Sequence, residues 1–229
     1  MTATRTLTSA DTSACGRAWV LVDQAVRGAT LRTMGTELLP TVLLETYEVH
    51  ETKHACAILH NDFPAEWQDI IEVLTEFRFR RSWILGGGGH KSKVASAIDD
   101  PLTSRGWVEK GFSTKLVVDG VTMDSPTHQV DCYRNRVALE IEWNNKDPFF
   151  DRDLNNFRLL FDLRAISVGV IVTRSDGLQT LFDKLAVGQK YGAATTHMSR
   201  LLRRINGGGG GGCPLLVFGI TLAQYLEDN

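Results

Sequence analysis

The chain has 229 residues, of which 43% are hydrophobic and 23% charged, an ordinary composition for a globular protein with a sizeable core. Its formal net charge of -2 gives no overall basic signature of a nucleic-acid-binding protein, although a local basic patch could still bind nucleic acid. Four separated cysteines without a C-x-x-C motif, and no stretch typical of a signal peptide or bilayer span, predict a cytoplasmic protein without a disulfide scaffold.

The first third of the chain is predicted to be mostly helical. Apolar residues recur at spacings of three and four over residues 36–62, where Pro40 lies close to a possible helix start. A second helix is predicted over residues 63–77. A short helix over Lys93–Ile98 is expected to end before Asp100-Pro101, because the residue before a proline is disfavoured in a helix.

The rest of the chain is predicted to form a sheet with crossover helices. Strands are expected over residues 112–120, 128–133, 136–143, 165–173 and 213–221, with turns at Asp119-Gly120 and Arg134-Asn135. The strand over 165–173 is the most apolar and is expected at the centre of the sheet. Helices are expected within residues 145–163, 178–186 and 194–205. The run Gly207–Gly212 is expected to form a flexible loop.

No domain boundary is apparent, so a single domain over residues 1–229 is expected. Residues 1–85 would form its mostly helical N-terminal part, and residues 86–229 would form the sheet and its associated helices. This order of elements predicts an α/β or α+β fold.

The stretch HETKHACAILH, which begins at His50, matches the H-E-x-x-H motif of zinc peptidases. In that motif two histidines one helical turn apart bind zinc, and the glutamate activates a water molecule. His60 stands where the longer form of the motif has a third histidine, but Ala57 replaces the glycine of its sharp turn. We therefore expect a helix that supports the fold or a dimer, and keep a zinc peptidase using His50, Glu51 and His54 as an alternative.

The stretch GGGGHKS, residues 86–92, partly matches a phosphate-binding loop. His90 stands where that motif has a glycine before the lysine, so the sequence does not predict an ATPase. Lys91, Ser92 and Lys93 begin the short predicted helix and are candidates for phosphate contacts. A mobile glycine loop with two solvated lysines is the alternative.

Three carboxylates are expected to converge near one predicted hairpin. Glu140 and Glu142 alternate with apolar residues along the strand 136–143, so both point to the same face. If strands 128–133 and 136–143 pair, Asp131 comes close to Glu140. Clustered like charges repel and cost desolvation, and a divalent cation such as Mg²⁺ would offset that cost. The alternative is a solvated face of an edge strand.

This stretch, with Asp131, eight residues, and then Glu140-Ile141-Glu142, resembles the D-(x)n-E-x-K core of the PD-(D/E)xK nucleases. Within that superfamily it is most similar to the BglII/BstYI type II restriction endonucleases. The likeness continues through WNNKDPFFDRDLNNFRLL and the strand ISVGVIVTR, and covers about Gly86 to Thr221. It implies a restriction-endonuclease-like α/β core, with a mixed central β-sheet flanked by helices and a helical N-terminal part.

The resemblance implies a homodimer that cuts double-stranded DNA at a short palindrome with Mg²⁺. Asp131 and Glu140 would hold the metal ion, with the carbonyl group of Ile141 nearby. Glu142 would orient or deprotonate the attacking water. At that position the superfamily usually has lysine, BglII has glutamine and the BamHI type has glutamate, so the number of metal ions stays open. Lys146 is a candidate for the missing positive charge.

The resemblance also indicates candidate DNA contacts. Asn144, Asn145 and Lys146 match the region where similar enzymes approach the major groove, and asparagine is suited to reading adenine. The further candidates are Arg174, Lys190, Tyr191, Thr195 and Thr196. For each of these residues the alternative is a solvated position in a loop.

A restriction role would bring further partners. Related enzymes usually cut at GATC-centred sites, although no residue of this sequence predicts that site. A cognate methyltransferase is also expected, because host DNA must be protected. No membrane partner is expected. A protein that keeps the nuclease fold but only binds DNA is a further alternative, against which the intact carboxylate triad argues.

Overall fold

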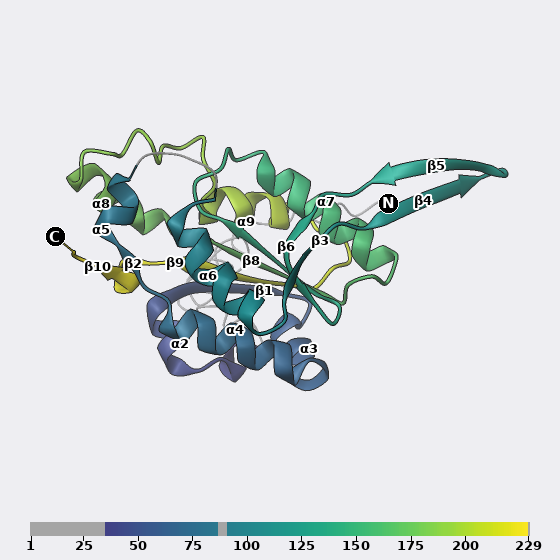
Figure 1. The fold of residues 1–229 in the computed structure, drawn as a ribbon, viewed down its shortest axis with the longest axis horizontal. Helices are drawn as coiled ribbons and strands as arrows, with labels where there is room; N and C mark the ends of the chain where they lie inside the picture. The colour runs from purple at the N-terminus through teal and green to yellow at the C-terminus, as the bar shows by residue number, and fades with distance from the viewer. Residues whose placement is uncertain (1–34, 87–90, 229) are drawn as a thin grey trace, which may run out of the picture. The chain divides into compact units, whose positions relative to one another are not determined.

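A six-stranded mixed sheet forms the centre of the structure, a computed structural model that describes residues 35–86 and 91–228 (Figure 1). The strands lie in the order β1 (Tyr47–Thr52), β9 (Leu215–Ile220), β8 (Val168–Arg174), β7 (Val137–Glu142), β6 (Val130–Arg134) and β3 (Val108–Lys110). The three middle strands β7, β8 and β9 are parallel, and the outer pairings are antiparallel. β8 lies between β7 and β9, which confirms the predicted central position of its apolar sequence.

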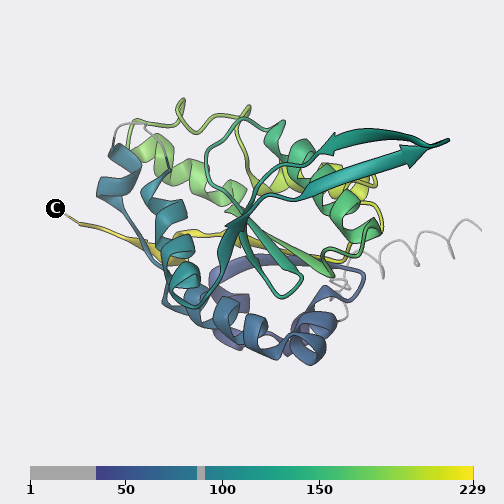
Figure 2. The same ribbon diagram turned by 45° about the vertical axis from the view of Figure 1, so that its right-hand side comes forward.

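Helices cover both faces of this sheet (Figures 1 and 2). One face packs against α2 (Thr41–Thr46), α3 (Ala55–Asp62), α4 (Pro64–Glu76) and α6 (Lys93–Ser104). The other face packs against α7 (Phe149–Asp162) and α9 (Met198–Asn206). The remaining elements are the helices α5 (Arg81–Leu85) and α8 (Gln179–Lys184), the 3-10 turns Thr36–Leu38, Asp176–Leu178 and Leu222–Gln224, and the paired strands β2 (Phe79–Arg80) and β10 (Tyr225–Leu226).

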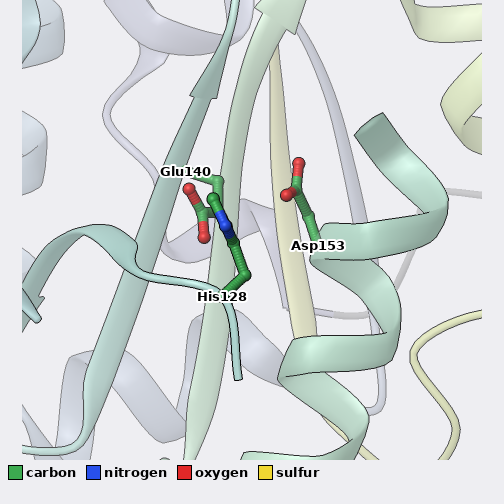
Figure 3. Close-up of side chains that lie close together, drawn as sticks. All are labelled: His128, Glu140 and Asp153. Atoms are coloured by element: carbon green, nitrogen blue, oxygen red, sulfur yellow. The ribbon is translucent and has the colours of Figure 1, made fainter. Parts of the chain in front are cut away.

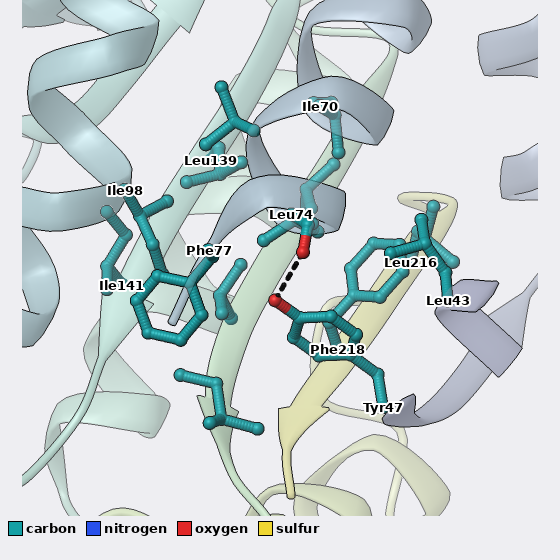
Figure 4. Packing of buried hydrophobic residues seen from close by; sticks show 14 of the residues in the cluster. Leu43, Tyr47, Ile70, Leu74, Phe77, Ile98, Leu139, Ile141, Leu216 and Phe218 are labelled. Carbon is teal, nitrogen blue, oxygen red and sulfur yellow. Dashed lines mark hydrogen bonds between the residues drawn. The ribbon is translucent and has the colours of Figure 1, made fainter. Parts of the chain in front are cut away.

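The helix α4 closes the core on the first face. Pro64 occupies its first turn, where a missing N–H costs nothing, and its apolar stripe lies against β7 and β9 (Figure 4). Ile70 and Leu74 are 1% exposed, and burying a side chain of this size stabilises the fold by about 1.5–3 kcal/mol. The hydroxyl group of Tyr47 on β1 donates a 2.8 Å hydrogen bond to the carbonyl group of Leu74, which fixes the edge strand against the helix.

The predicted helix through HETKHACAILH is wrong over its first half. His50 lies in β1, which pairs antiparallel with β9, and α3 begins only at Ala55. Lys53 and His54 form the turn between them, with φ values of 52° and 60° that a helix cannot contain. The sheet therefore takes its edge strand from the part of the chain before residue 86.

The glycine run is an ordered turn in the structure, where a flexible loop was predicted. Backbone hydrogen bonds close turns from Gly207 to Cys213. Gly210 has a φ of 80°, and a side chain there would meet Leu215 at 2.9 Å. Gly211 has a φ of 54° and leaves similarly little room beside Arg158. A positive φ and close packing against β9 therefore favour glycine at position 210, and both glycines let the turn pass close to α7 and β9.

A hairpin outside the main sheet joins β3 to β6. Its strands β4 (Ser113–Val118) and β5 (Val121–Pro126) pair around Asp119-Gly120, where both φ values are positive, as the predicted turn requires. The strand β5 was missed, because its segment VTMDSP has too few apolar residues to indicate a strand. No helix in the described ranges is both long and apolar enough to cross a bilayer.

Candidate functional site

The hairpin of β6 and β7 brings the predicted carboxylates together. Cys132 pairs with Leu139, so Asp131 stands beside Glu140 across the two strands. The Oδ2 atom of Asp131 accepts a 3.0 Å hydrogen bond from the backbone N–H of Ile141, and the N–H of Asp131 lies 3.4 Å from Oε2 of Glu140. The expected proximity of Asp131 and Glu140 is confirmed.

The two glutamates of β7 are buried between strand and helix. Glu140 and Glu142 are 0% and 1% exposed, and β7 is an interior strand, so the alternative of a solvated edge is wrong. Both point away from the apolar face formed by Leu139 and Ile141, toward the face that α7 covers. Whatever satisfies these carboxyl groups must therefore come from the protein interior or from a bound ion.

The helix α7 supplies a fourth carboxylate, from Asp153, to this cluster. Asp153 is 0% exposed, and one oxygen atom from it, one from Glu140 and a ring nitrogen of His128 lie within 4.8 Å of one another (Figure 3). His128 lies in the segment before β6, and the side-chain amide of Asn156 on α7 donates a 3.1 Å hydrogen bond to its carbonyl group. One face of α7 thus supplies the carboxylate of Asp153 and, through Asn156, holds the backbone of His128.

The cluster also contains one cation, on Arg152. Its guanidinium group donates to Oδ1 of Asp153 at 2.8 Å and to Oε1 of Glu142 at 3.3 Å. The side-chain amide of Asn145 donates to Oε2 of Glu142 at 2.7 Å, so both oxygens of this carboxyl group are held. Arg152, not the predicted Lys146, places a positive charge beside Glu142; Lys146 is exposed and pairs through its backbone with Thr195.

Burial shifts the titration of these groups. Desolvation is the largest cause in each case: it raises the pKa of Glu140 well above its usual range, that of Glu142 to about 9 and that of Asp153 to about 6. Repulsion from Asp153 adds to the rise in the pKa of both glutamates, whereas Arg152 opposes the rise at Asp153. Burial also lowers the pKa of His128, which favours the neutral imidazole.

The residues present fit a divalent cation. Oε1 of Glu140 and Oδ2 of Asp153 are buried and have no hydrogen-bond partner. Buried polar atoms normally find a partner, because desolvating an unpaired one is costly. A cation between these oxygens would satisfy them and offset the repulsion among carboxylates that one guanidinium does not neutralise.

The glycine-rich stretch is only partly described, since residues 87–90, including His90, fall outside the described ranges. Lys91 forms an ion pair with Asp99, and the hydroxyl group of Ser92 caps α6 by accepting from the N–H of Ala95 at 3.0 Å. Lys93 is exposed on the first turn of α6. Of the three candidates for phosphate contacts, the structure thus commits Lys91 and Ser92 to α6 itself.

Arg174 and Tyr191 are buried, with exposed fractions of 2% each, so neither is placed for a direct DNA contact. The guanidinium group of Arg174 donates to the carbonyl group of Tyr191 at 2.7 Å and to the hydroxyl group of Thr195 at 2.8 Å. The ring of Tyr191 stacks on Phe182, and Lys190 donates to carbonyl groups at the end of α5. These residues hold the loop before α9 in place.

That loop lies against the segment that follows β7. The backbone N–H of Asn145 donates to the hydroxyl group of Thr196, whose own N–H donates to the carbonyl group of Asn145 at 2.8 Å. Asn144 is half-buried, and its Oδ1 atom has no hydrogen-bond partner. The predicted DNA-contact segments around 144–146 and 195–196 are therefore neighbours in space. Thr196 itself is completely buried, so, like Arg174 and Tyr191, it is not placed for a direct DNA contact.

The H-E-x-x-H stretch does not form a zinc site. His50 is in a strand and contacts Glu48, whereas His54 is in the following turn, so the two do not share a helix face. The carboxyl group of Glu51 is buried and accepts from the N–H of Cys56 at 3.0 Å. Among the described residues, the group suited to holding a metal ion contains neither histidine.

Sequence reasoning did not predict three residues of the cluster: His128, Arg152 and Asp153. Asp153 had a recognisable signature, because it falls within the apolar stripe of the helix expected after the strand, beside Leu154 and Phe157. A charged residue on a buried helix face indicates a partner. For His128 the sequence offers only its residue type.

Comparison with known proteins agrees with this geometry. A family model described as restriction endonuclease BglII/BglIII matches residues 47–220, well over half of the chain. A search of curated proteins gave no match. The matched region contains the whole acidic cluster and also His50 and His54, which sets aside the zinc peptidase. The chain belongs to the BglII/BglIII family of restriction endonucleases and is a type II site-specific deoxyribonuclease.

Proposed function

We propose that this enzyme hydrolyses phosphodiester bonds of double-stranded DNA at a short palindromic site, with Mg²⁺ as its cofactor. One observation supports the cofactor most directly. Glu140 is completely buried, interacts with the carboxyl groups of Asp131, Glu142 and Asp153, and has one oxygen without a hydrogen-bond partner. Such an arrangement is costly in a resting protein and is suited to a divalent cation.

In this proposal Asp131 and Glu140 hold Mg²⁺, together with the carbonyl group of Ile141. When bound, the ion polarises the scissile phosphate, neutralises developing charge and lowers the pKa of a bound water. Glu142 orients or deprotonates the attacking water. To act as a base it must be ionised, and a bound cation favours this by lowering the raised pKa of its carboxyl group. Asn145 and Arg152 hold the orientation of its carboxyl group through the contacts already described.

Digestion of DNAs of known sequence tests the proposal. The protein is incubated with Mg²⁺ and with EDTA, alongside the variant Asp131→Ala. Discrete fragments are expected only for the unmodified protein in Mg²⁺, and the fragment ends would give the site, including any GATC centre. Cleavage by Asp131→Ala at the normal rate, or unchanged cleavage in EDTA, would contradict the assignment. Methylated and unmethylated substrates are compared, because host DNA would be protected by a cognate methyltransferase.

We further propose that the segment 144–146 approaches the bases and phosphates, with Lys146 as a phosphate contact. Lys146 is exposed and lies close to the site. Replacing it by alanine is expected to weaken binding to all DNA sequences and to reduce the salt dependence by about one counterion. Binding is measured in Ca²⁺ over a range of salt concentrations.

Arg164→Ala is the matched control for Lys146→Ala. Arg164 is exposed in the turn between α7 and β8, at the opposite end of the parallel strands from Lys146, which follows the end of β7. Its loss is expected to leave the salt dependence unchanged. Equal effects of both variants would show that Lys146 acts only through net charge.

We propose a homodimer, because a palindromic DNA site has two-fold symmetry and a two-fold symmetric dimer can bind both halves in the same way. Light scattering of the purified protein, alone and with duplex DNA, tests this through the molecular mass. A cytoplasmic location is also proposed. It is supported by Cys56, Cys132 and Cys213, which are free and buried, as suits a reducing compartment, and cell fractionation tests it.

A further inference from the structure

A second set of ligand atoms adjoins the proposed Mg²⁺ position. It is formed by His128 before β6, Glu140 on β7 and Asp153 on α7, each of which offers one atom within 4.8 Å of the others. Figure 3 shows the three side chains pointing toward one another from these three elements. Glu140 is the only member that also belongs to the position proposed for Mg²⁺.

Two carboxylate oxygens of this set have no hydrogen-bond donor within the described part of the protein. Oε1 of Glu140 and Oδ2 of Asp153 have no hydrogen-bond partner, and both residues are completely buried. Arg152 engages Asp153 through its other oxygen, Oδ1. The carboxyl group of Glu142 also contacts Asp153 and can donate a hydrogen bond to it only while Glu142 is protonated. When Glu142 is ionised, the set retains two unpaired acceptors close together, which is the arrangement that a bound cation would satisfy.

The imidazole of His128 distinguishes this set from an all-oxygen site. Mg²⁺ prefers oxygen ligands and keeps much of its water, whereas Mn²⁺ and later divalent metals accept an imidazole nitrogen more readily. The backbone of His128 is held beside the helix that carries Asp153, because Asn156 on that helix donates a hydrogen bond to its carbonyl group.

We propose that His128, Glu140 and Asp153 form a second cation position, which shares Glu140 with the Mg²⁺ position and takes Mn²⁺ in preference to Mg²⁺. This inference rests on the proposed function, since it adds a cation to the same site. It assigns His128 and Asp153 as metal ligands and makes the centre a two-cation one when Mn²⁺ is present.

Titration of the full-length protein with Mn²⁺, followed by electron paramagnetic resonance of the free ion, tests the proposal without DNA or activity. Two Mn²⁺ ions per chain are expected for the unmodified protein, and one for His128→Ala. Excess Mg²⁺ is expected to displace one ion easily and the other at least about tenfold less readily. Asp131→Asn is expected to retain the Mn²⁺ ion that resists Mg²⁺.

His128→Asn and His60→Ala are the companion variants. The asparagine replaces the ring nitrogen by an amide oxygen, so it is expected to keep cation binding but to lose the preference for Mn²⁺. This variant also serves if His128→Ala does not fold, as judged by circular dichroism. His60 is exposed on α3 and outside the cluster, and its replacement is expected to leave two ions.

A single Mn²⁺ in the unmodified protein, or two in His128→Ala, would overturn the second position. Equal displacement of both ions by Mg²⁺ would overturn its preference. DNA cleavage in Mg²⁺ that is lost in Asp131→Ala would still support the proposed function in either case. Failure of the two proposals is therefore distinguishable.

Discussion

Replacing Glu140 by glutamine is expected to remove DNA cleavage and, in EDTA, to raise the temperature at which the protein unfolds. The two effects have opposite signs because the carboxyl group of Glu140 binds the cation that cleavage needs, whereas in the metal-free protein its burial destabilises the fold. Glu140 is completely buried beside Asp131, Glu142 and Asp153, and one of its oxygens has no partner. Glutamine keeps the shape of the side chain and removes a group that must be buried either ionised or with a proton that the unfolded chain does not bind at pH 8.

General magnitudes give the scale of the loss of cleavage and of the rise in unfolding temperature. Loss of a metal ligand that stabilises developing charge is expected to lower the cleavage rate by about a thousandfold or more. In a protein of this length, each kcal/mol gained is expected to raise the unfolding temperature by about 2–4 °C. Initial cleavage rates in Mg²⁺ and thermal unfolding in EDTA, both at pH 8, measure the two.

Glu66→Gln is the matched control, because Glu66 is equally buried but has a cationic partner. It is 3% exposed, and its carboxylate lies 3.3 Å from the guanidinium group of Arg134. Here glutamine is expected to lower the unfolding temperature in EDTA, since it leaves Arg134 with one partner fewer. If Glu140→Gln lowers it as well, the cluster is not strained by its charges and the argument for a cation weakens.

The carboxylates of β6 and β7 could be predicted because their geometry is local. A strand alternates its side chains, and a short turn fixes the pairing of two neighbouring strands, so Asp131 meets Glu140 whatever else the chain does. Asp153 reaches the same point only after α7 docks on the sheet. Sequence periodicity predicts that α7 is a helix, but it does not predict where the helix packs on the sheet.

The error at HETKHACAILH has a different cause. The apolar spacing over residues 36–62 spans α2, β1 and α3, and averages two helices with a strand between them. The breaks fall at Lys53 and His54, which adopt left-handed backbone conformations without a glycine or proline to announce them. Pattern reasoning that depends on such residues cannot place a boundary here.

The DNA-contact candidates show a third limit. The resemblance indicated Arg174 and Tyr191 as DNA contacts, yet the structure buries both and uses them to hold the loop before α9. A buried arginine that donates to a backbone carbonyl group positions a segment, and it does so from the end of the central strand. Sequence reasoning therefore assigned a DNA contact to residues that support a loop.

The metal-free protein is expected to lose stability as the pH rises from 7 to 9. In the folded state the pKa of Glu142 is raised to about 9 and that of Glu140 is raised well above its usual range, against ordinary values of 4.5 in the unfolded chain. Across this window the folded protein therefore binds more protons than the unfolded chain, so raising the pH favours unfolding. Each such group contributes up to about 1.4 kcal/mol per pH unit.

Within the cluster, only these two glutamates titrate in this window. The pKa of Asp153 is raised only to about 6, and the pKa of His128 is lowered from 6.5, so both act below pH 7. Burial also raises the pKa of the thiols of Cys56, Cys132 and Cys213, which adds a loss of stability close to pH 9 that Glu142→Gln leaves unchanged. Denaturant unfolding in EDTA at intervals between pH 7 and 9 measures the slope. Glu142→Gln is expected to flatten it, because glutamine does not titrate.

Divalent cations are expected to reverse this dependence. A cation at the cluster binds the ionised carboxylates, so the stability that Mg²⁺ or Mn²⁺ adds grows with pH as protons are displaced. The difference between unfolding free energies with and without cation should thus be larger at pH 9 than at pH 7. A difference that is constant over this range would mean that the cation does not bind at these carboxyl groups, because binding there must displace their protons.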